Sequence, residues 1–203
     1  MIYLYSGTPG SGKSLHVAQI IKNRCRSNLP TISNFDINAD RVKHYKTAFY
    51  YVENENLTPD DLREFSYEYF TLHRHKFSED GILLVIDEAQ LLFNCREWDG
   101  KKRADWISFF TQHRKMGFKV ILIAQFDRML DRQIRSLLEY EYIHRKVSNF
   151  GVMGRLLSAV TFGKLHVCVK IWYPLHERIG SEFFKARKSL YGIYDSYGTF
   201  KKV

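Results

Sequence analysis

The sequence predicts an α/β fold with a mainly parallel central sheet flanked by helices. Along residues 1–150, short apolar runs alternate with segments whose apolar residues follow helical spacing, an order typical of a doubly wound sheet. Residues 82–86 are all aliphatic, as expected of a strand buried on both faces of a parallel sheet. After residue 149, alternating apolar residues and glycines indicate a small antiparallel extension.

The predicted order of elements in the core is strand, helix, strand, insertion, strand, helix, strand, helix and strand. These elements cover residues 2–5, 14–26, 31–37, 38–80, 82–86, 104–116, 118–124, 127–138 and 140–147. Within the polar, mostly helical insertion, Thr58 followed by Pro59 marks a helix start. Gly117 is expected to end one helix and Asp127 to cap the next. We therefore assign residues 1–150 to the core and 151–203 to a β-rich extension of the same domain.

Size and charge limit the class of protein. A chain of 203 residues with 45% hydrophobic residues can form one compact domain. The excess of 31 basic over 22 acidic residues gives a net charge of +9, which favours phosphates, nucleic acid or an anionic membrane surface without choosing among them.

Cysteine usage and hydropathy indicate the compartment. Cys25, Cys95 and Cys168 are widely spaced, which favours a reduced, cytosolic chain over a metal knuckle or a disulfide framework. The N-terminus lacks a signal-peptide pattern, and the longest apolar run, residues 82–86, is far shorter than the roughly 20 residues that span a bilayer. We expect this sequence to cross no membrane.

A phosphate-binding motif follows the first predicted strand. Residues 7–14 read GTPGSGKS and match the P-loop pattern G-x-x-x-x-G-K-[ST]. Its glycines let backbone N–H groups point at a phosphate, Lys13 can reach the β- and γ-phosphates, and the Ser14 hydroxyl can bind Mg²⁺. The strand before the motif and the helix after it favour a true P-loop over a Gly-rich turn. The predicted ATP-binding residues are Gly7, Thr8, Pro9, Gly10, Ser11, Gly12, Lys13, Ser14 and Leu15.

Polar residues end two later strands. Asp87 and Glu88 follow the buried run 82–86, at the edge where α/β sheets bind ligands. We expect Asp87 to hold Mg²⁺ through water, together with Ser14, and Glu88 to activate the attacking water. Gln125 ends the next strand and could sense the γ-phosphate or the water, so the predicted catalytic residues are Lys13, Glu88 and Gln125. Alternatively, the acidic pair only caps a helix and Gln125 only closes its strand.

Other polar residues give weaker signals. Arg114, Arg132, Arg135 and Arg145 are each candidates for an arginine finger acting in a neighbouring subunit, although a solvated or ion-paired role is the simpler interpretation of any one. His73 and His75 lack further ligands of metal-site type, so no protein-bound zinc is assigned.

Taken in order, several motifs resemble one family. They are MIYLYSGTPGSGKS, SNFDI, LLVIDEAQLLF with Arg96, Glu97 and Trp98 after it, TQHRKMGFKVILIAQ, IRSLLEYEYIHRK and the closing YGIYDSYG. Together they are similar to the zonula occludens toxin-like (Zot) family, which includes assembly ATPases of filamentous phages. The resemblance is clearest over residues 1–150 and weakens afterwards.

The resemblance implies a P-loop ATPase of the additional-strand, catalytic-glutamate (ASCE, RecA-like) class, related to the FtsK and HerA DNA-pumping motors. The family pattern matches Lys13, Ser14, Asp87 and Glu88, but it does not map an arginine finger. It implies a homo-oligomeric ring that uses ATP and Mg²⁺ to drive assembly and extrusion of single-stranded DNA phage. Phage assembly proteins and a DNA or DNA–protein complex would be its partners.

Localisation is also implied by family alone. Such proteins work at the cytoplasmic face of the bacterial inner membrane and usually continue into a membrane-spanning helix and an outer domain. This sequence ends at Val203, so we expect it to be either the cytoplasmic part or a shorter member.

Two other functions remain open from the residues. The same loop serves phosphotransferases such as kinases, although Glu88 beside Asp87 suits water activation better. A nucleotide-gated scaffold or toxin-like module with little hydrolysis is the other alternative.

Overall fold

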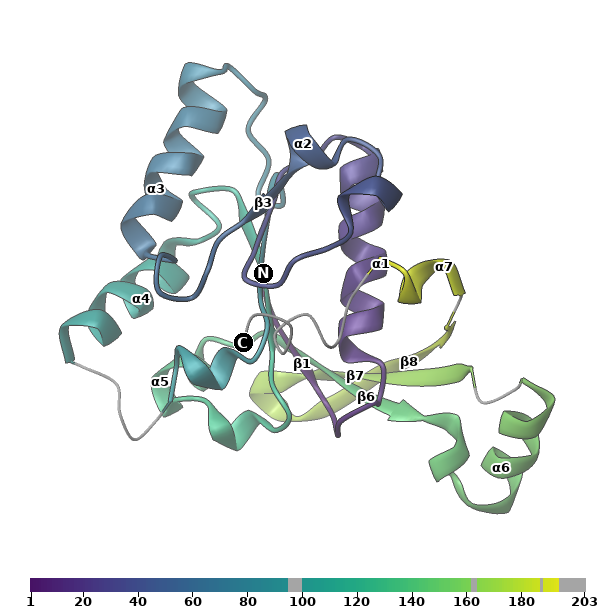
Figure 1. Ribbon diagram of the computed structural model, residues 1–203. Helices are drawn as coiled ribbons and strands as arrows, with labels where there is room; N and C mark the ends of the chain where they lie inside the picture. The colour runs from purple at the N-terminus through teal and green to yellow at the C-terminus, as the bar shows by residue number, and fades with distance from the viewer. Residues whose placement is uncertain (95–99, 162–163, 187, 194–203) are drawn as a thin grey trace.

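The computed structural model describes residues 1–94, 100–161, 164–186 and 188–193 (Figure 1). An eight-stranded sheet runs through the molecule in the order β3-β2-β4-β5-β1-β6-β7-β8. Pairing is parallel from β3 to β6 and antiparallel from β6 to β8. The strands are β1 (Ile2–Ser6), β2 (Thr31–Ser33), β3 (Phe49–Tyr51), β4 (Ile82–Ile86), β5 (Phe118–Ile123), β6 (Tyr140–Lys146), β7 (Leu165–Trp172) and β8 (Glu177–Lys185).

Helices cover both faces of the parallel part of the sheet, so two hydrophobic cores form (Figure 1). One core includes residues of α1 (Lys13–Arg26), α2 (Tyr45–Ala48) and α7 (Lys188–Tyr191). The other includes residues of α3 (Pro59–Tyr67), α4 (Gly100–Gln112) and α5 (Arg132–Ser136). Strand β4 serves both cores, since Ile82, Leu84 and Ile86 face one and Leu83 and Val85 face the other. This double burial explains the continuous aliphatic run in its sequence.

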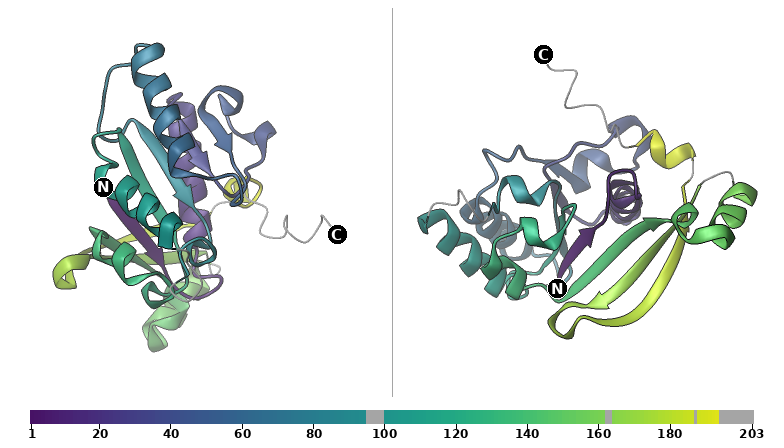
Figure 2. Two further views of the ribbon diagram at one scale, coloured as in Figure 1. Left: turned by 90° about the vertical axis from the view of Figure 1, so that its left-hand side faces the viewer. Right: turned by 90° about the horizontal axis from the view of Figure 1, so that it is seen from below.

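An antiparallel ribbon of strands β6, β7 and β8 extends the sheet beyond β1 (Figure 2). Strands β6, β7 and β8 pair antiparallel, as the alternating pattern after residue 149 predicts. Helix α6 (Gly151–Val160) lies apart from the other helices, in the connection between β6 and β7. Its Val152, Leu156 and Val160 are exposed.

Several local predictions are confirmed. Strand β4 has the predicted bounds, and α1 begins one residue earlier than expected. Helix α3 begins after Thr58, whose hydroxyl accepts a hydrogen bond from the Asp61 N–H at 3.2 Å, with Pro59 in the first turn. Capping residues report on the few residues around them, so they can be recognised without tertiary information.

The predicted helix from Asp127 to residue 138 is wrong. A 3₁₀ turn covers Asp127–Met129, and the helix proper is α5, which begins after Asp131. Leu130 between them is fully buried, extended, and bridged to Asn94. The Asp131 carboxylate accepts a hydrogen bond from the Gln133 N–H at 2.8 Å and caps α5 instead. Tertiary burial of Leu130 thus breaks a segment whose apolar spacing suits one helix.

Strand β3 and helices α6 and α7 are absent from the sequence prediction, and one strand is shorter than predicted. The polar stretch 38–80 contains β3, an edge strand of only three residues with Tyr50 and Tyr51 exposed. Helix α6 starts at Gly151 and contains Gly154, and glycine disfavours helices. The strand expected over residues 31–37 ends at Ser33.

Some predicted features lie outside the described residues. These are Cys95, the Arg96, Glu97 and Trp98 cluster, and the closing motif after residue 193. Within the described ranges, no helix combines the length and apolar character needed to cross a bilayer.

Candidate functional site

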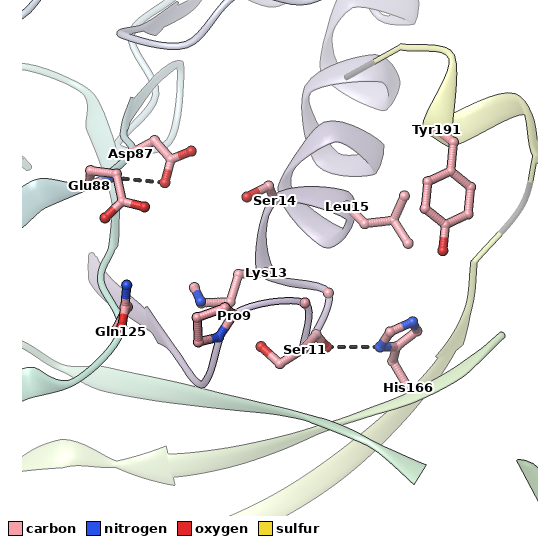
Figure 3. A pocket seen from close by; sticks show the side chains of 12 residues that line it. Pro9, Ser11, Lys13, Ser14, Leu15, Asp87, Glu88, Gln125, His166 and Tyr191 are labelled. Carbon is pink, nitrogen blue, oxygen red and sulfur yellow. Dashed lines mark hydrogen bonds between the residues drawn. The ribbon is translucent and has the colours of Figure 1, made fainter. Parts of the chain in front are cut away.

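The predicted site residues converge because of strand order. Strand β5 lies between β1 and β4. It is the additional strand that the resemblance to the ASCE class implies. The three parallel strands end at the same edge of the sheet, where α/β folds bind ligands. A pocket of about 360 Å³ opens there (Figure 3). Its wall is formed by residues 9–15 of the loop and helix start, together with Asp87, Glu88, Gln125, His166 and Tyr191.

The loop conformation requires glycine at two close approaches. Gly7 has a φ of 135°, and a Cβ there would lie 2.4 Å from the His144 carbonyl oxygen on β6. Gly12 has a φ of 100°, and a Cβ there would lie 2.8 Å from His166 Nδ1 on β7. Both glycines therefore bring the loop directly onto the ribbon strands, in backbone conformations that other residues adopt at a cost.

Two buried histidines, His144 and His166, contact the loop or the residues beside it. His144 Nδ1 lies 2.8 Å from the Tyr142 carbonyl oxygen, and its Nε2 lies 2.9 Å from His16 Nδ1 on α1. His166 Nδ1 lies 2.8 Å from the Ser11 carbonyl oxygen. Burial lowers the pKa of His144 to about 3, so its ring is neutral at pH 7. Sequence reasoning missed these residues because their partners are up to 155 residues away.

The start of α1 suits an anion. The first N–H groups of any helix lack helical partners and carry partial positive charge. In α1 no side chain caps them and the first turn contains no acidic residue. Because residues 9–15 line the pocket, the helix start lies at its wall. This arrangement fits a phosphate group.

Lys13 contacts the loop itself. Its Nζ donates a hydrogen bond to the Gly7 carbonyl oxygen at 2.6 Å. Burial lowers the pKa of this amine, while the nearby charges of Asp87 and Glu88 oppose that shift. A phosphate that entered the pocket would offer the ammonium a charged partner in place of a carbonyl.

Asp87 and Ser14 provide oxygen atoms on neighbouring parts of the wall (Figure 3). The Asp87 carboxylate accepts a hydrogen bond from the Glu88 N–H at 2.9 Å. Burial raises the pKa of Asp87 to about 6, with the neighbouring Glu88 charge adding to the shift. Hard oxygen donors and a carboxylate destabilised by burial are what Mg²⁺ would favour.

Glu88 has an unusual backbone. Its φ of 46° and ψ of 47° place it in the left-handed region, which costs a residue with a side chain roughly 1 kcal/mol. Its carboxylate is exposed and accepts a hydrogen bond from the Gln90 side-chain amide. Strain of this kind concentrates at functional positions.

Asn34 is a site residue that the sequence reasoning missed. Its Oδ1 accepts a hydrogen bond from the Asp87 N–H at 2.6 Å, and its Nδ2 donates to the Asp87 carbonyl oxygen at 2.8 Å. Nδ2 also contacts Asn54 Oδ1 at 2.6 Å. One amide thus fixes both main-chain groups of Asp87. The available signal was its position directly after β2, the neighbour of β4.

Of the remaining predicted residues, some line the pocket and others do not. Gln125 lines the pocket, and its carbonyl oxygen accepts a hydrogen bond from the Gly7 N–H at 3.1 Å. Gly7 and Thr8 lie at the base of the loop and are not among the residues that line the pocket. Arg114 pairs with Glu139, and Arg135 lies 3.9 Å from Asp127. Among the described residues, the pocket wall includes no arginine.

The chain matches one family model, and relatives with similar sequences are phage proteins. The family model of zonular occludens toxin (Zot) matches residues 1–201. The gene 1 proteins of Enterobacteria phages fd and M13 are each 26% identical over 215 residues, covering 98% of this chain and 60% of the relative. The gene 1 protein of Salmonella phage IKe is 26% identical over 174 residues, covering 81% and 46%. The chain thus spans about 60% of the length of the first two relatives.

Solved structures with similar folds are P-loop NTPases. The N-terminal domain of zonular occludens toxin from Neisseria meningitidis has a TM-score of 0.58 at 21% identity, covering 96% of this chain and 98% of that one. The genome packaging NTPase B204 of Sulfolobus turreted icosahedral virus 2, in complex with AMPPCP, has a TM-score of 0.52 at 14% identity, covering 92% and 97%. The DNA-packaging ATPase B204 from Sulfolobus turreted icosahedral virus has a TM-score of 0.54 at 15% identity, covering 92% and 97%. The fold of this chain is therefore that of a P-loop NTPase.

Proposed function

Because the chain belongs to the zonular occludens toxin (Zot) family, we propose that it is a Mg²⁺-dependent ATPase that powers phage assembly. ATP hydrolysis would drive the extrusion of single-stranded DNA phage, and the protein would act at the cytoplasmic face of the bacterial inner membrane. The observation that carries the ATPase proposal is the convergence of Lys13, Asp87, Glu88 and Gln125 on one pocket at the sheet edge.

Similar proteins support both the role in phage assembly and the binding of ATP. The relatives at 26% identity are phage proteins, which supports a role in the phage life cycle. The packaging NTPase B204, whose fold is similar, binds AMPPCP. For this chain, the loop backbone and Lys13 would bind the phosphates of ATP, with Lys13 exchanging the Gly7 carbonyl oxygen for phosphate oxygens.

Ser14 and Asp87 would hold Mg²⁺, which when bound neutralises charge on the phosphates. Asn34 would keep Asp87 oriented through its two main-chain hydrogen bonds. Glu88 would accept a proton from the attacking water, and its exposed carboxylate leaves that position accessible. Gln125 would contact the γ-phosphate or the same water from the end of β5.

An oligomer would complete the site. The pocket wall lacks an arginine among the described residues, whereas phosphoryl transfer is often assisted by an arginine from a neighbouring subunit. A homo-oligomeric ring would supply one, and the exposed Arg132 and Arg145 are candidates. The net charge of +9 suits contact with DNA or an anionic membrane surface.

Phosphate release from ATP, measured with and without Mg²⁺, tests the ATPase proposal. We expect Lys13→Ala to abolish both nucleotide binding and hydrolysis, because the charge that contacts the phosphates is lost. Glu88→Gln should slow hydrolysis by about 100-fold or more while ATP still binds, because general-base catalysis contributes on that order. Lys115→Ala, which removes an exposed lysine outside the pocket, is the matched control and should leave both properties unchanged.

The outcomes separate the alternatives. Undiminished turnover in both Lys13→Ala and Glu88→Gln would contradict the proposal. Turnover only in the presence of an acceptor would indicate a phosphotransferase. Tight ATP binding with negligible turnover in the assembled oligomer would indicate a nucleotide-gated scaffold.

A further inference from the structure

The two ends of the pocket differ in chemistry. Asp87, Glu88 and Gln125 lie at one end, and Leu15 and Tyr191 lie at the other, with the loop between them (Figure 3). The first end is polar and carries two carboxyl groups. The second consists of the Leu15 side chain, the Tyr191 ring and the imidazole of His166.

This polarity gives a nucleotide one direction in the pocket. The terminal phosphate belongs at the end that holds the proposed catalytic groups, Glu88 and Gln125. The α-phosphate and nucleoside must then leave the loop toward Leu15, which directly follows the P-loop serine in α1. The flat face of the base is the part of the nucleotide that suits a wall with an aliphatic side chain and aromatic rings.

Tyr191 is exposed although its surroundings are fixed. Its side chain is 57% exposed, while Leu190 and Ile193 on either side are 4% and 1% exposed. Both neighbours pack in the core that contains α1, and the Ile193 carbonyl oxygen accepts a hydrogen bond from the Asn38 N–H at 2.8 Å. A short segment anchored on both sides therefore presents one aromatic ring to the pocket.

We propose that Tyr191 is the base-recognition residue of this site, stacking on the adenine ring of ATP against the Leu15 side of the pocket. The proposal rests on the function proposed above, since it requires that the loop binds the phosphates of a nucleotide. Stacking uses the face of the base, so the contact should tolerate either purine. It would add affinity for the nucleoside without contributing to phosphate binding.

Binding measurements with a base-free probe test this assignment. Calorimetric titration in Mg²⁺ would compare ATP with inorganic tripolyphosphate, which has the phosphate chain but no base. Tyr191→Ala should weaken ATP binding by about 5- to 30-fold, the range expected for one lost stacking contact. Its affinity for tripolyphosphate should equal that of the unmodified chain. Tyr191→Phe keeps the aromatic face and should keep ATP affinity.

Tyr67→Ala is the matched control, because Tyr67 on α3 is 58% exposed and lies outside the pocket. It should leave binding of both probes unchanged. Equal weakening of ATP and tripolyphosphate by Tyr191→Ala would overturn the proposal, because it would show only a structural effect on the loop. Unchanged ATP affinity in Tyr191→Ala would overturn it as well.

The test also separates this proposal from the one on which it rests. If Lys13→Ala leaves ATP and tripolyphosphate binding unaltered, the nucleotide-binding function itself is contradicted. If Lys13→Ala weakens both probes and Tyr191→Ala weakens neither, only the assignment of Tyr191 fails.

Discussion

At the residue scale, the site depends on side chains that position others. Asp87 lies at the end of β4, where its main chain leaves the sheet and loses the ladder hydrogen bonds of a strand interior. Asn34 replaces them with hydrogen bonds to both the N–H and the carbonyl group of Asp87. A buried polar group that loses its partner destabilises the fold by about 1–3 kcal/mol, so this amide is important for local order.

We therefore predict that Asn34→Ala lowers the free energy of unfolding by about 1–3 kcal/mol and reduces the rate of ATP hydrolysis more than ATP binding. Denaturant unfolding and steady-state kinetics would measure the two effects. Asn54→Ala is the control, because it removes one contact of the Asn34 amide but keeps both hydrogen bonds from Asn34 to Asp87, so its effect on hydrolysis should be smaller. Equal effects of the two variants on hydrolysis would contradict a positioning role for Asn34.

At the scale of elements, the segment after β5 shows how burial can override local pattern. Both Asp127 and Asp131 are residue types that cap helices, but only Asp131 caps α5. Asp131 is buried and also pairs with Arg103 of α4 at 2.8 Å. Asp127 instead accepts a hydrogen bond from the Tyr173 hydroxyl at 2.9 Å. The cap of α5 is thus combined with a contact between two helices.

Alanine substitution should distinguish the two aspartates. Asp131→Ala should lower the free energy of unfolding by about 1–3 kcal/mol, because it removes both the cap of α5 and the ion pair with Arg103. Asp127→Ala should cost about 1 kcal/mol, the value of one hydrogen bond. Thermal or urea unfolding of both variants checks this order, and a larger loss for Asp127→Ala would contradict the assignment of the cap.

At the scale of the whole molecule, the antiparallel ribbon is part of the loop's support. His144 on β6 and His166 on β7 contact the P-loop region from strands that follow it by more than 100 residues. Burial is the main cause of the low pKa of His144, and the adjacent His16 adds to the shift. Folding must keep this ring neutral, which couples the stability of the molecule to pH.

The sign of that coupling follows from linkage. Histidine has an ordinary pKa of 6.5, against about 3 for His144 in the folded chain, so between these values the unfolded chain binds more protons. Stability from this group is present above pH 6.5 and is lost as the pH falls. Acidification from pH 7 to 5 should lower the free energy of unfolding by about 2 kcal/mol through His144 alone.

Urea unfolding at both pH values would measure this loss. His144→Gln should reduce the pH dependence by that amount relative to the unmodified chain. His176→Gln, which alters an exposed histidine, should leave the profile unchanged. Parallel profiles for the unmodified chain and His144→Gln would contradict the coupling.

The sequence by itself determined the parts whose signals are local. The apolar run of β4, the P-loop between a strand and a helix, and the Thr58 cap each depend on a few consecutive residues, so pattern and turn chemistry were enough. The meeting of the loop with Asp87, Glu88 and Gln125 was also predictable, because parallel strands end at one edge.

Only the tertiary structure decided the rest. The break at Leu130, the clamp of Asn34 on Asp87 and the histidines beneath the loop depend on partners distant in the chain. The same holds for Tyr191, an ordinary exposed tyrosine in the sequence, which the packing of Leu190 and Ile193 brings to the pocket. Periodicity and spacing describe neighbours along the chain, whereas these contacts arise from burial and close packing between segments that the fold brings together.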